Sequence, residues 1–287
     1  MSSPALDPYF TVLDVDTTSA DDAPAVESGT LTRVEASGST AGPWFADAQH
    51  MGPPSALLVR ALERESGRDD VRLARVTVEV LGKVPVGPLE LRSHVARRGR
   101  TIELVAAELA APGSGSGAPR AVARASGWFH GVLDTAGVAT VPGSAMPALP
   151  GPDEGVRRDI PEGWLPGYLT SVDWRWIEGG LDETGPGRAW GRLLTQVVAG
   201  EEPSPAQRLA AVADSTNGCA SRLDLRSWLF VNTDLTLHLH RAPRGEWTGL
   251  DADSVIGPEG TGTAYSVLHD ETGPVGRAAQ ALTVRPR

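Results

Sequence analysis

Apolar and polar residues alternate along two long parts of the chain, and each part contains one helical stretch. In the first half, residues 55–65 carry apolar side chains at three- and four-residue spacing, which predicts an amphipathic helix. In the second half, the helical stretch is residues 204–218. Period-two alternation after each helix predicts four strands, and two strand-like segments precede each helix. The expected strands are residues 9–15, 29–35, 75–81, 89–95, 101–109, 121–129, 168–177, 188–197, 228–240, 246–254, 262–268 and 275–284.

The second helix has clear end signals and one residue that does not fit a purely structural role. Ser204 is a good N-cap, Pro205 suits the first helical position, and Gln207 completes a Ser-x-x-Gln capping box. Gly218 is expected to end the helix. Asp214 lies in the last turn, where the helix dipole disfavours a carboxylate. That placement makes Asp214 a candidate functional acid.

The two halves of the chain share residues as well as a pattern. Short segments of the first half match segments of the second half, including the prolines and glycines of a turn. The matched segments are 83–89 with 241–247, which aligns Pro85 with Pro243 and Gly87 with Gly245, and 122–127 with 275–280. Similarity at about half the chain length indicates two copies of one structural unit.

Each unit is expected to be α+β, with antiparallel strands curved around one long central helix. We expect a first unit at residues 1–131 and a second unit, carrying the catalytic residues, at residues 164–287. Residues 132–163 are rich in Pro and Gly and lack periodicity, which is typical of a linker.

Composition narrows the possible partners and compartments. The 287 residues are 40% hydrophobic and 22% charged, as in globular proteins, and their formal net charge is −10. That charge argues against binding to nucleic acid or to an anionic membrane. The single cysteine, Cys219, excludes an internal disulfide and fits a reducing compartment. No apolar run approaches the length of a membrane span, so we expect a cytoplasmic protein.

Comparing aligned positions of the two halves helps to identify functional residues, because a residue needed only for the fold is expected in both copies. Three polar residues of the second half stand opposite different residues in the first: Asn232 opposite Ala74, Gln280 opposite Gly127, and Asp214 opposite Glu63. One carboxylate and two carboxamides can supply a general base and groups that orient a water molecule. The alternative is a buried hydrogen-bond cluster that only satisfies its own members.

These residues resemble the type II acyl-CoA thioesterases. The resemblance depends on Asp214 in its helix, on the strand at residues 231–243 and on residues 276–282 near the end of the chain. It implies a tandem, or double, hot-dog fold, in which two fused units reproduce the dimer of single hot-dog enzymes. It also implies that an acyl-CoA thioester is cleaved to free acid and CoA, without a cofactor or a metal.

The family holds its hydrolytic water with an Asp, a Thr or Ser, and a Gln. Carried over to this chain, the acid is Asp214 and the amide is Gln280, while the hydroxyl position falls on Asn232 and departs from the pattern. A shift of one residue would place Thr233 there instead. The resemblance implies direct attack by water, with Asp214 as the base. Backbone N–H groups near Met51 and Gly52 are expected to stabilise the oxyanion.

His50 precedes the first helix and is expected to line the acyl pocket, although a loop or core histidine without a catalytic part is the alternative. Two rival functions stay open at this point. A catalytically weak acyl-CoA-binding or sensing protein is suggested by Asn232 at the hydroxyl position. An enoyl-CoA hydratase requires a catalytic histidine near an acid, and the nearest pair in sequence, Asp47 and His50, lacks the five-residue spacing of hot-dog hydratases. Assembly into a homo-oligomer is a further expectation from the family.

Overall fold

The computed structural model of the chain describes residues 6–18, 29–113, 117–140, 143 and 146–287. In the first half, the strands are β1 (Phe10–Thr18), β2 (Gly29–Ala36), β3 (Val71–Val80), β4 (Pro88–Arg97), β5 (Ile102–Ala111) and β6 (Arg120–Gly131), with helix α1 (Gly52–Ser66). In the second half, the strands are β7 (Val172–Glu178), β8 (Gly187–Leu193), β9 (Trp228–Asn232), β10 (Asp234–Leu239), β11 (Trp247–Ile256), β12 (Thr261–Asp270) and β13 (Gly273–Pro286), with helices α2 (Pro205–Ala213) and α3 (Thr216–Cys219).

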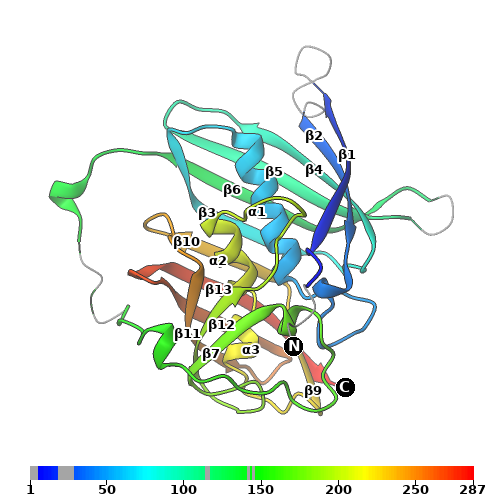
Figure 1. Ribbon diagram of the computed structural model, residues 1–287, viewed down its shortest axis with the longest axis vertical. Helices are drawn as coiled ribbons and strands as arrows, with labels where there is room; N and C mark the ends of the chain where they lie inside the picture. The colour runs from blue at the N-terminus through cyan, green and yellow to red at the C-terminus, as the bar shows by residue number, and fades with distance from the viewer. Residues whose placement is uncertain (1–5, 19–28, 114–116, 141–142, 144–145) are drawn as a thin grey trace.

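The expectation of a double hot-dog fold is confirmed. The first half pairs its strands in the order β1-β2-β4-β5-β6-β3, and the second half in the order β10-β13-β12-β11-β8-β7 (Figure 1). Every one of these pairings is antiparallel. Strands β3 and β10 pair with each other, so the two half-sheets form one continuous sheet across the described residues. Leu235 lies opposite Val78 and Leu237 opposite Val76 along this seam. All four side chains are buried, which joins the two cores.

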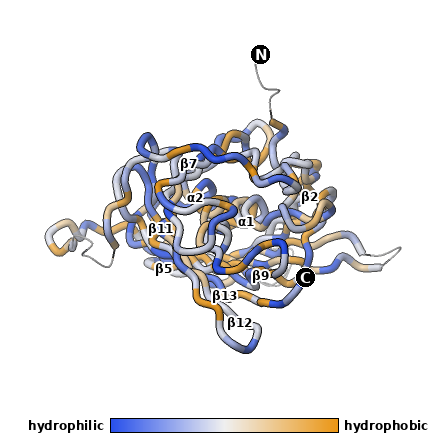
Figure 2. Tube along the Cα trace, turned by 90° about the horizontal axis from the view of Figure 1, so that it is seen from below, coloured by the Kyte–Doolittle hydropathy of each residue, from blue (hydrophilic) through white to orange (hydrophobic). Residues whose placement is uncertain are grey.

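Helices α1 and α2 pack against each other in the interior and are surrounded by strands (Figure 2). They run in opposite directions, because the end of each helix lies at the start of the other. The Glu63 carboxylate, near the end of α1, accepts hydrogen bonds from Ser204 Oγ at 2.9 Å and from Gln207 Nε2 at 2.8 Å at the start of α2. Negative charge at a helix start is favourable. Ser204 is the N-cap, as expected, but the Gln207 side chain binds Glu63 and does not complete a capping box.

The helix expected at residues 204–218 is interrupted. Helix α2 ends at Ala213 with Asp214 as its C-cap, and α3 starts at Thr216, so the prediction that Gly218 ends the helix is wrong. The Gln280 side chain lies across this break. Its Nε2 donates to the carbonyl oxygen of Asp214 at 3.0 Å, and its Oε1 accepts from the N–H of Asn217 at 3.0 Å. These bonds replace helical ones and hold Asp214 at a helix end that is buried in the core.

The strand expected at residues 228–240 is also interrupted. Asn232 pairs with Leu282 and Thr236 with Ala279, so the β9–β10 segment has one more residue than β13 at this point. This is a β-bulge, and it changes the direction of neighbouring side chains. The side chain of Asp234 stabilises it by accepting from the N–H of Ala281 at 2.7 Å. The first half has a register shift between Leu73 and Arg75, the position that corresponds to the second-half bulge.

Candidate active site

Asp214 is the centre of a cluster formed by three segments that are distant in the chain. Its side chain is 3% exposed. Oδ1 accepts a hydrogen bond from Nδ2 of Asn232 at 2.9 Å, and Oδ2 lies 3.1 Å from Nδ1 of His50. Asn232 comes from the bulge between β9 and β10, whereas His50 precedes α1. The structure therefore brings His50 and Asn232 to the same carboxyl group.

Gln280 belongs to the same cluster but does not contact the carboxyl group. Both of its bonds go to the backbone at the break between α2 and α3, at Asp214 and Asn217. Its geometry therefore positions the main chain that carries Asp214. One N–H of its amide stays available for a further acceptor, because each amide nitrogen has two hydrogens.

His50 is held by its neighbours on two sides. Its ring stacks on that of Tyr168, with 3.9 Å between centroids and 13° between planes. Its Nδ1 accepts from the N–H of Gly52 at 3.0 Å. The Tyr168 hydroxyl donates to the Ala211 carbonyl at 2.8 Å and lies 3.0 Å from the hydroxyl of Ser215. Tyr168 and Ser215 were not among the residues expected from the sequence, since no local pattern marks them.

The protonation states follow from burial. Burial raises the pKa of Asp214 to about 7, against the opposing effect of the Asn232 hydrogen bond. Burial lowers the pKa of His50 to about 3, so the imidazole is neutral at physiological pH and the contact is not an ion pair. Nδ1 of the neutral ring accepts the hydrogen bond from the N–H of Gly52 with its single lone pair, and Oδ2 of Asp214 lies 3.1 Å from the same nitrogen. The ring proton of His50 is then on Nε2, which has no hydrogen-bond partner among the described residues.

The start of α1 approaches α2 very closely. A Cβ atom on Gly52 would lie 2.4 Å from the carbonyl oxygen of Ala211 and 2.9 Å from the Tyr168 ring. Met51 is the N-cap and makes no side-chain capping bond. The N–H groups expected to bind an oxyanion are scarce, because that of Gly52 already donates to His50 and Pro53 and Pro54 have none.

Thr233 lies in the bulge and is exposed. Its hydroxyl is 3.4 Å from the carbonyl oxygen of Ala281, and its backbone N–H donates to the same oxygen at 2.9 Å. Asn232, one residue earlier, is the one whose side chain reaches Asp214. Of the two residues considered for the hydroxyl position, Asn232 is therefore the one in contact with Asp214.

A small cavity of about 40 Å³ adjoins the cluster. It contacts the cluster at His50, Ser215 and Asn217, and four tryptophans contribute to its other walls: Trp44, Trp164, Trp174 and Trp176. Cys219 also lines it, is buried, and has a thiol whose pKa is raised by burial.

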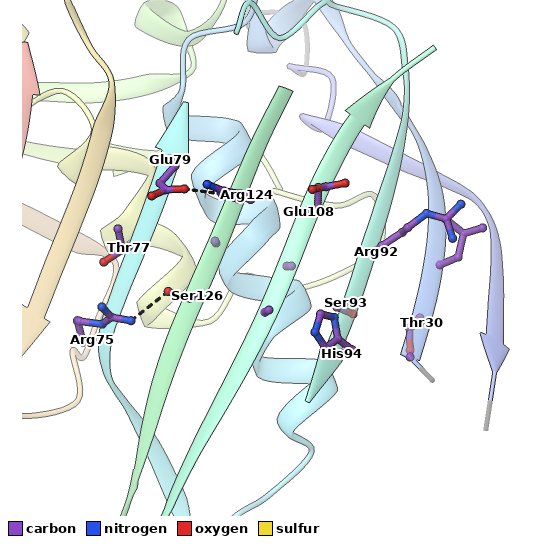
Figure 3. A pocket seen from close by; sticks show the side chains of 15 residues that line it. Thr30, Arg75, Thr77, Glu79, Arg92, Ser93, His94, Glu108, Arg124 and Ser126 are labelled. Carbon is purple, nitrogen blue, oxygen red and sulfur yellow. Dashed lines mark hydrogen bonds and ion pairs between the residues drawn. The ribbon is translucent and has the colours of Figure 1, made fainter. Parts of the chain in front are cut away.

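A larger cavity of about 730 Å³ lies on the outer face of the first-half sheet (Figure 3). Arg75, Thr77 and Glu79 of β3 point into it, on the face opposite α1, while Val76 and Val78 alternate toward the helix. Its charged groups include pairs such as Arg124 with Glu79. None of the residues expected in the catalytic site lines it, so we place the candidate active site at Asp214.

The corresponding place in the first half is filled with apolar groups. A Cβ atom on Gly127, which stands opposite Gln280, would lie 3.0 Å from the Leu62 side chain and 3.2 Å from that of Leu73. Glu63, opposite Asp214, binds the start of α2 instead. Among the described residues, the polar cluster around Asp214 therefore has no counterpart in the first half.

Other kinds of site find no support in the described residues. No three His, Cys, Asp or Glu side chains in them gather to hold a metal ion. Nor does any described helix have the length and apolar composition needed to cross a membrane.

Comparison with known proteins agrees with the fold. Residues 40–130 match the acyl-CoA thioesterase N-terminal domain, and residues 147–284 match the C-terminal domain of the same family. No curated protein matches the chain in sequence.

Solved structures are similar over most of the chain at low identity. A hot-dog protein of unknown function from Alicyclobacillus acidocaldarius is 14% identical with a TM-score of 0.69, covering 90% of this chain and 93% of that one. Acyl-CoA thioesterase II TesB2 from Mycobacterium marinum is 15% identical with a TM-score of 0.65, covering 96% and 97%. The tesB protein of Mycobacterium avium subspecies paratuberculosis is 16% identical with a TM-score of 0.64, covering 89% and 93%. Since both domains of the family are matched in order, the chain belongs to the acyl-CoA thioesterase family.

Proposed function

We propose that this protein hydrolyses acyl-CoA thioesters by direct attack of water, with Asp214 as the general base. The observation that supports this most is the buried carboxyl group of Asp214, whose pKa is raised to about 7 and which contacts Asn232 and His50. His50 in turn lines a cavity. A general base is most effective when its pKa lies near the working pH. We further infer a cytoplasmic location and association into homo-oligomers, both of which stay predictions.

In the proposed reaction, ionised Asp214 takes a proton from water as the water oxygen attacks the thioester carbonyl carbon. The tetrahedral intermediate collapses, the carbon–sulfur bond breaks, and the proton returns from Asp214 to the departing thiolate. Asn232 donates to Oδ1 of Asp214 and to the Asp234 carbonyl oxygen, which leaves its own Oδ1 to accept from the water. Gln280 keeps the main chain of Asp214 in position.

His50 is the donor that we assign to the developing oxyanion. Its Nδ1 faces Gly52 and Asp214, so its Nε2–H is the group left for the thioester oxygen. A neutral imidazole at the start of a helix can polarise a carbonyl group, as in triosephosphate isomerase. The His50 side chain would take the role of backbone N–H donors at the start of α1, which Pro53 and Pro54 lack.

The rate should depend on pH through the ionisation of Asp214. Only the ionised acid can act as base, so kcat/KM is expected to rise with pH through about 7 and to level off above it. The neighbouring titratable groups do not interfere, because the pKa of His50 is lowered to about 3 and that of Tyr168 is raised well above its usual value. Thiol release measured from pH 5 to pH 9 would check this. A flat or falling profile contradicts Asp214 as the base.

One observation favours a second candidate function. A hydratase needs a histidine beside an acid, and the structure supplies this pair as His50 and Asp214 at 3.1 Å, whereas Asp47 binds Lys83. Such a pair could add water across the double bond of an enoyl thioester. Incubation with crotonyl-CoA distinguishes the two reactions, because hydration removes the enoyl absorbance without releasing thiol. We expect thiol release from butyryl-CoA and no hydration. The opposite outcome would identify a hydratase.

A further inference from the structure

The cavity lined by His50 and Ser215 has a size and a lining that limit what it can hold. Its volume is about 40 Å³. For comparison, an apolar cavity of about 150 Å³ is enough to hold benzene. The space is therefore suited to a few carbon atoms, and a long acyl chain would need its walls to move apart.

Two of the walls belong to a rigid element. Trp174 and Trp176 lie on β7, are 9% and 3% exposed, and have ring centroids 6.3 Å apart. Trp174 also packs edge-on against Tyr168, the ring on which His50 stacks. Residues two apart on a strand point to the same face, so both indoles close the same end of the cavity. Strand β7 pairs with β8 continuously from Val172 to Trp176, which fixes the backbone at both tryptophans.

The other two tryptophans come from loops. Trp44 packs edge-on against Phe230, with 5.5 Å between centroids, and carries the guanidinium of Arg287 above its ring at 5.4 Å. Trp164 packs against the hydrophobic core from the segment before β7. The lining contains no Asp, Glu, Lys or Arg, and its one titratable imidazole, His50, is neutral. A charged acyl group would therefore meet no counter-ion.

We infer that the protein selects short, uncharged acyl groups of about two to four carbon atoms, with Trp174 and Trp176 forming the end of the acyl site. This inference rests on the proposed function, because it assumes that the acyl group enters the cavity next to His50. Longer chains are excluded by the indole rings, since moving a strand-borne side chain out of a close-packed core carries a large steric cost.

The test is a chain-length series of acyl-CoA thioesters from acetyl to dodecanoyl, with kcat/KM determined by thiol release. We expect butyryl-CoA to exceed octanoyl-CoA at least tenfold. In Trp176→Leu, octanoyl-CoA should gain at least tenfold relative to butyryl-CoA. Trp164→Ala, in a less buried wall, provides a second variant should Trp176→Leu fail to fold. Trp247→Leu is the matched control, because that tryptophan lies on β11 against Arg192 and does not line the cavity.

The outcomes separate this inference from the proposed function. Hydrolysis with equal efficiency for all chain lengths, or a preference for octanoyl-CoA, overturns the inference and leaves the function standing. If no thioester is hydrolysed, the proposed function fails, and calorimetric titration with butyryl-CoA and octanoyl-CoA tests the cavity alone. Tighter binding of butyryl-CoA, reversed in Trp176→Leu, supports the inference. Equal binding of both, or binding of neither, overturns it.

Discussion

Asp214→Asn is expected to lower kcat/KM for acyl-CoA hydrolysis by about a thousandfold, because the asparagine amide cannot accept a proton from water. The substitution is close to isosteric with the protonated acid. The asparagine oxygen can accept from Asn232 as Oδ1 of Asp214 does, and the asparagine nitrogen takes the place of Oδ2 beside His50. Thiol release by purified parent and variant, measured at pH 8, provides the comparison. If Asp214→Asn hydrolyses the thioester as fast as the parent protein, Asp214 is not the base.

The same variant should be more stable than the parent at alkaline pH. This result would show that the variant is folded and that its loss of activity has another cause. Burial raises the pKa of Asp214 from 3.8 to about 7, so the folded state holds the proton more tightly than the unfolded chain. The protonated Asp214 side chain therefore contributes to the free energy of unfolding. This contribution is fully present below pH 3.8 and is lost as pH rises through about 7. A shift of this size corresponds to at most about 4 kcal/mol.

Asparagine does not ionise, so Asp214→Asn should gain about 2 kcal/mol over the parent at pH 8 and little at pH 4. Urea unfolding at the two pH values measures the difference. A variant less stable than the parent at pH 8 would mean that the ionised carboxylate is better stabilised in the fold than its contacts suggest.

Gly52→Ala is expected to lower kcat/KM by about a hundredfold, since displacement of catalytic groups by about 1 Å has effects of that order. The added Cβ would lie 2.4 Å from the carbonyl oxygen of Ala211, and neither helix backbone can yield without moving His50 or Asp214. We also expect a loss of about 1–3 kcal/mol in the free energy of unfolding. Gly38→Ala is the control, because a Cβ atom there has no neighbour within 4 Å. Wild-type kinetics in Gly52→Ala would show that the α1–α2 approach does not set the site geometry.

Much of the fold could be predicted from the sequence because its signals are local or periodic. Alternation marked the strands, and Ser204 and Pro205 marked the start of α2 through the hydrogen bond and backbone angle that a helix start requires. The duplicated turn at Pro85 and Pro243 marked two copies of one unit. Comparing the copies then singled out Asp214, Asn232 and Gln280, which the structure places in one cluster.

The interruptions of regular structure were not predictable in the same way. The Ala- and Leu-rich sequence before Asp214 favours helix but does not say where the helix breaks. The break at Asp214 and Ser215 is held by Gln280, 66 residues away. The bulge at Thr233 depends on Asp234 bonding to Ala281 of another strand. Both features orient side chains of the candidate site, and both arise from partners that are distant in the chain.

The sequence by itself therefore determined the repeated architecture and the start of α2, and it singled out Asp214 as the candidate acid. Only the tertiary structure showed that the side chain of His50 contacts Asp214 and that Asn232 reaches the same carboxyl group from a bulged strand. The reason is physical. The His50–Asp214 contact exists because α1 and α2 pack in opposite directions with Gly52 against Ala211, and no local propensity or period encodes a contact between two helix ends.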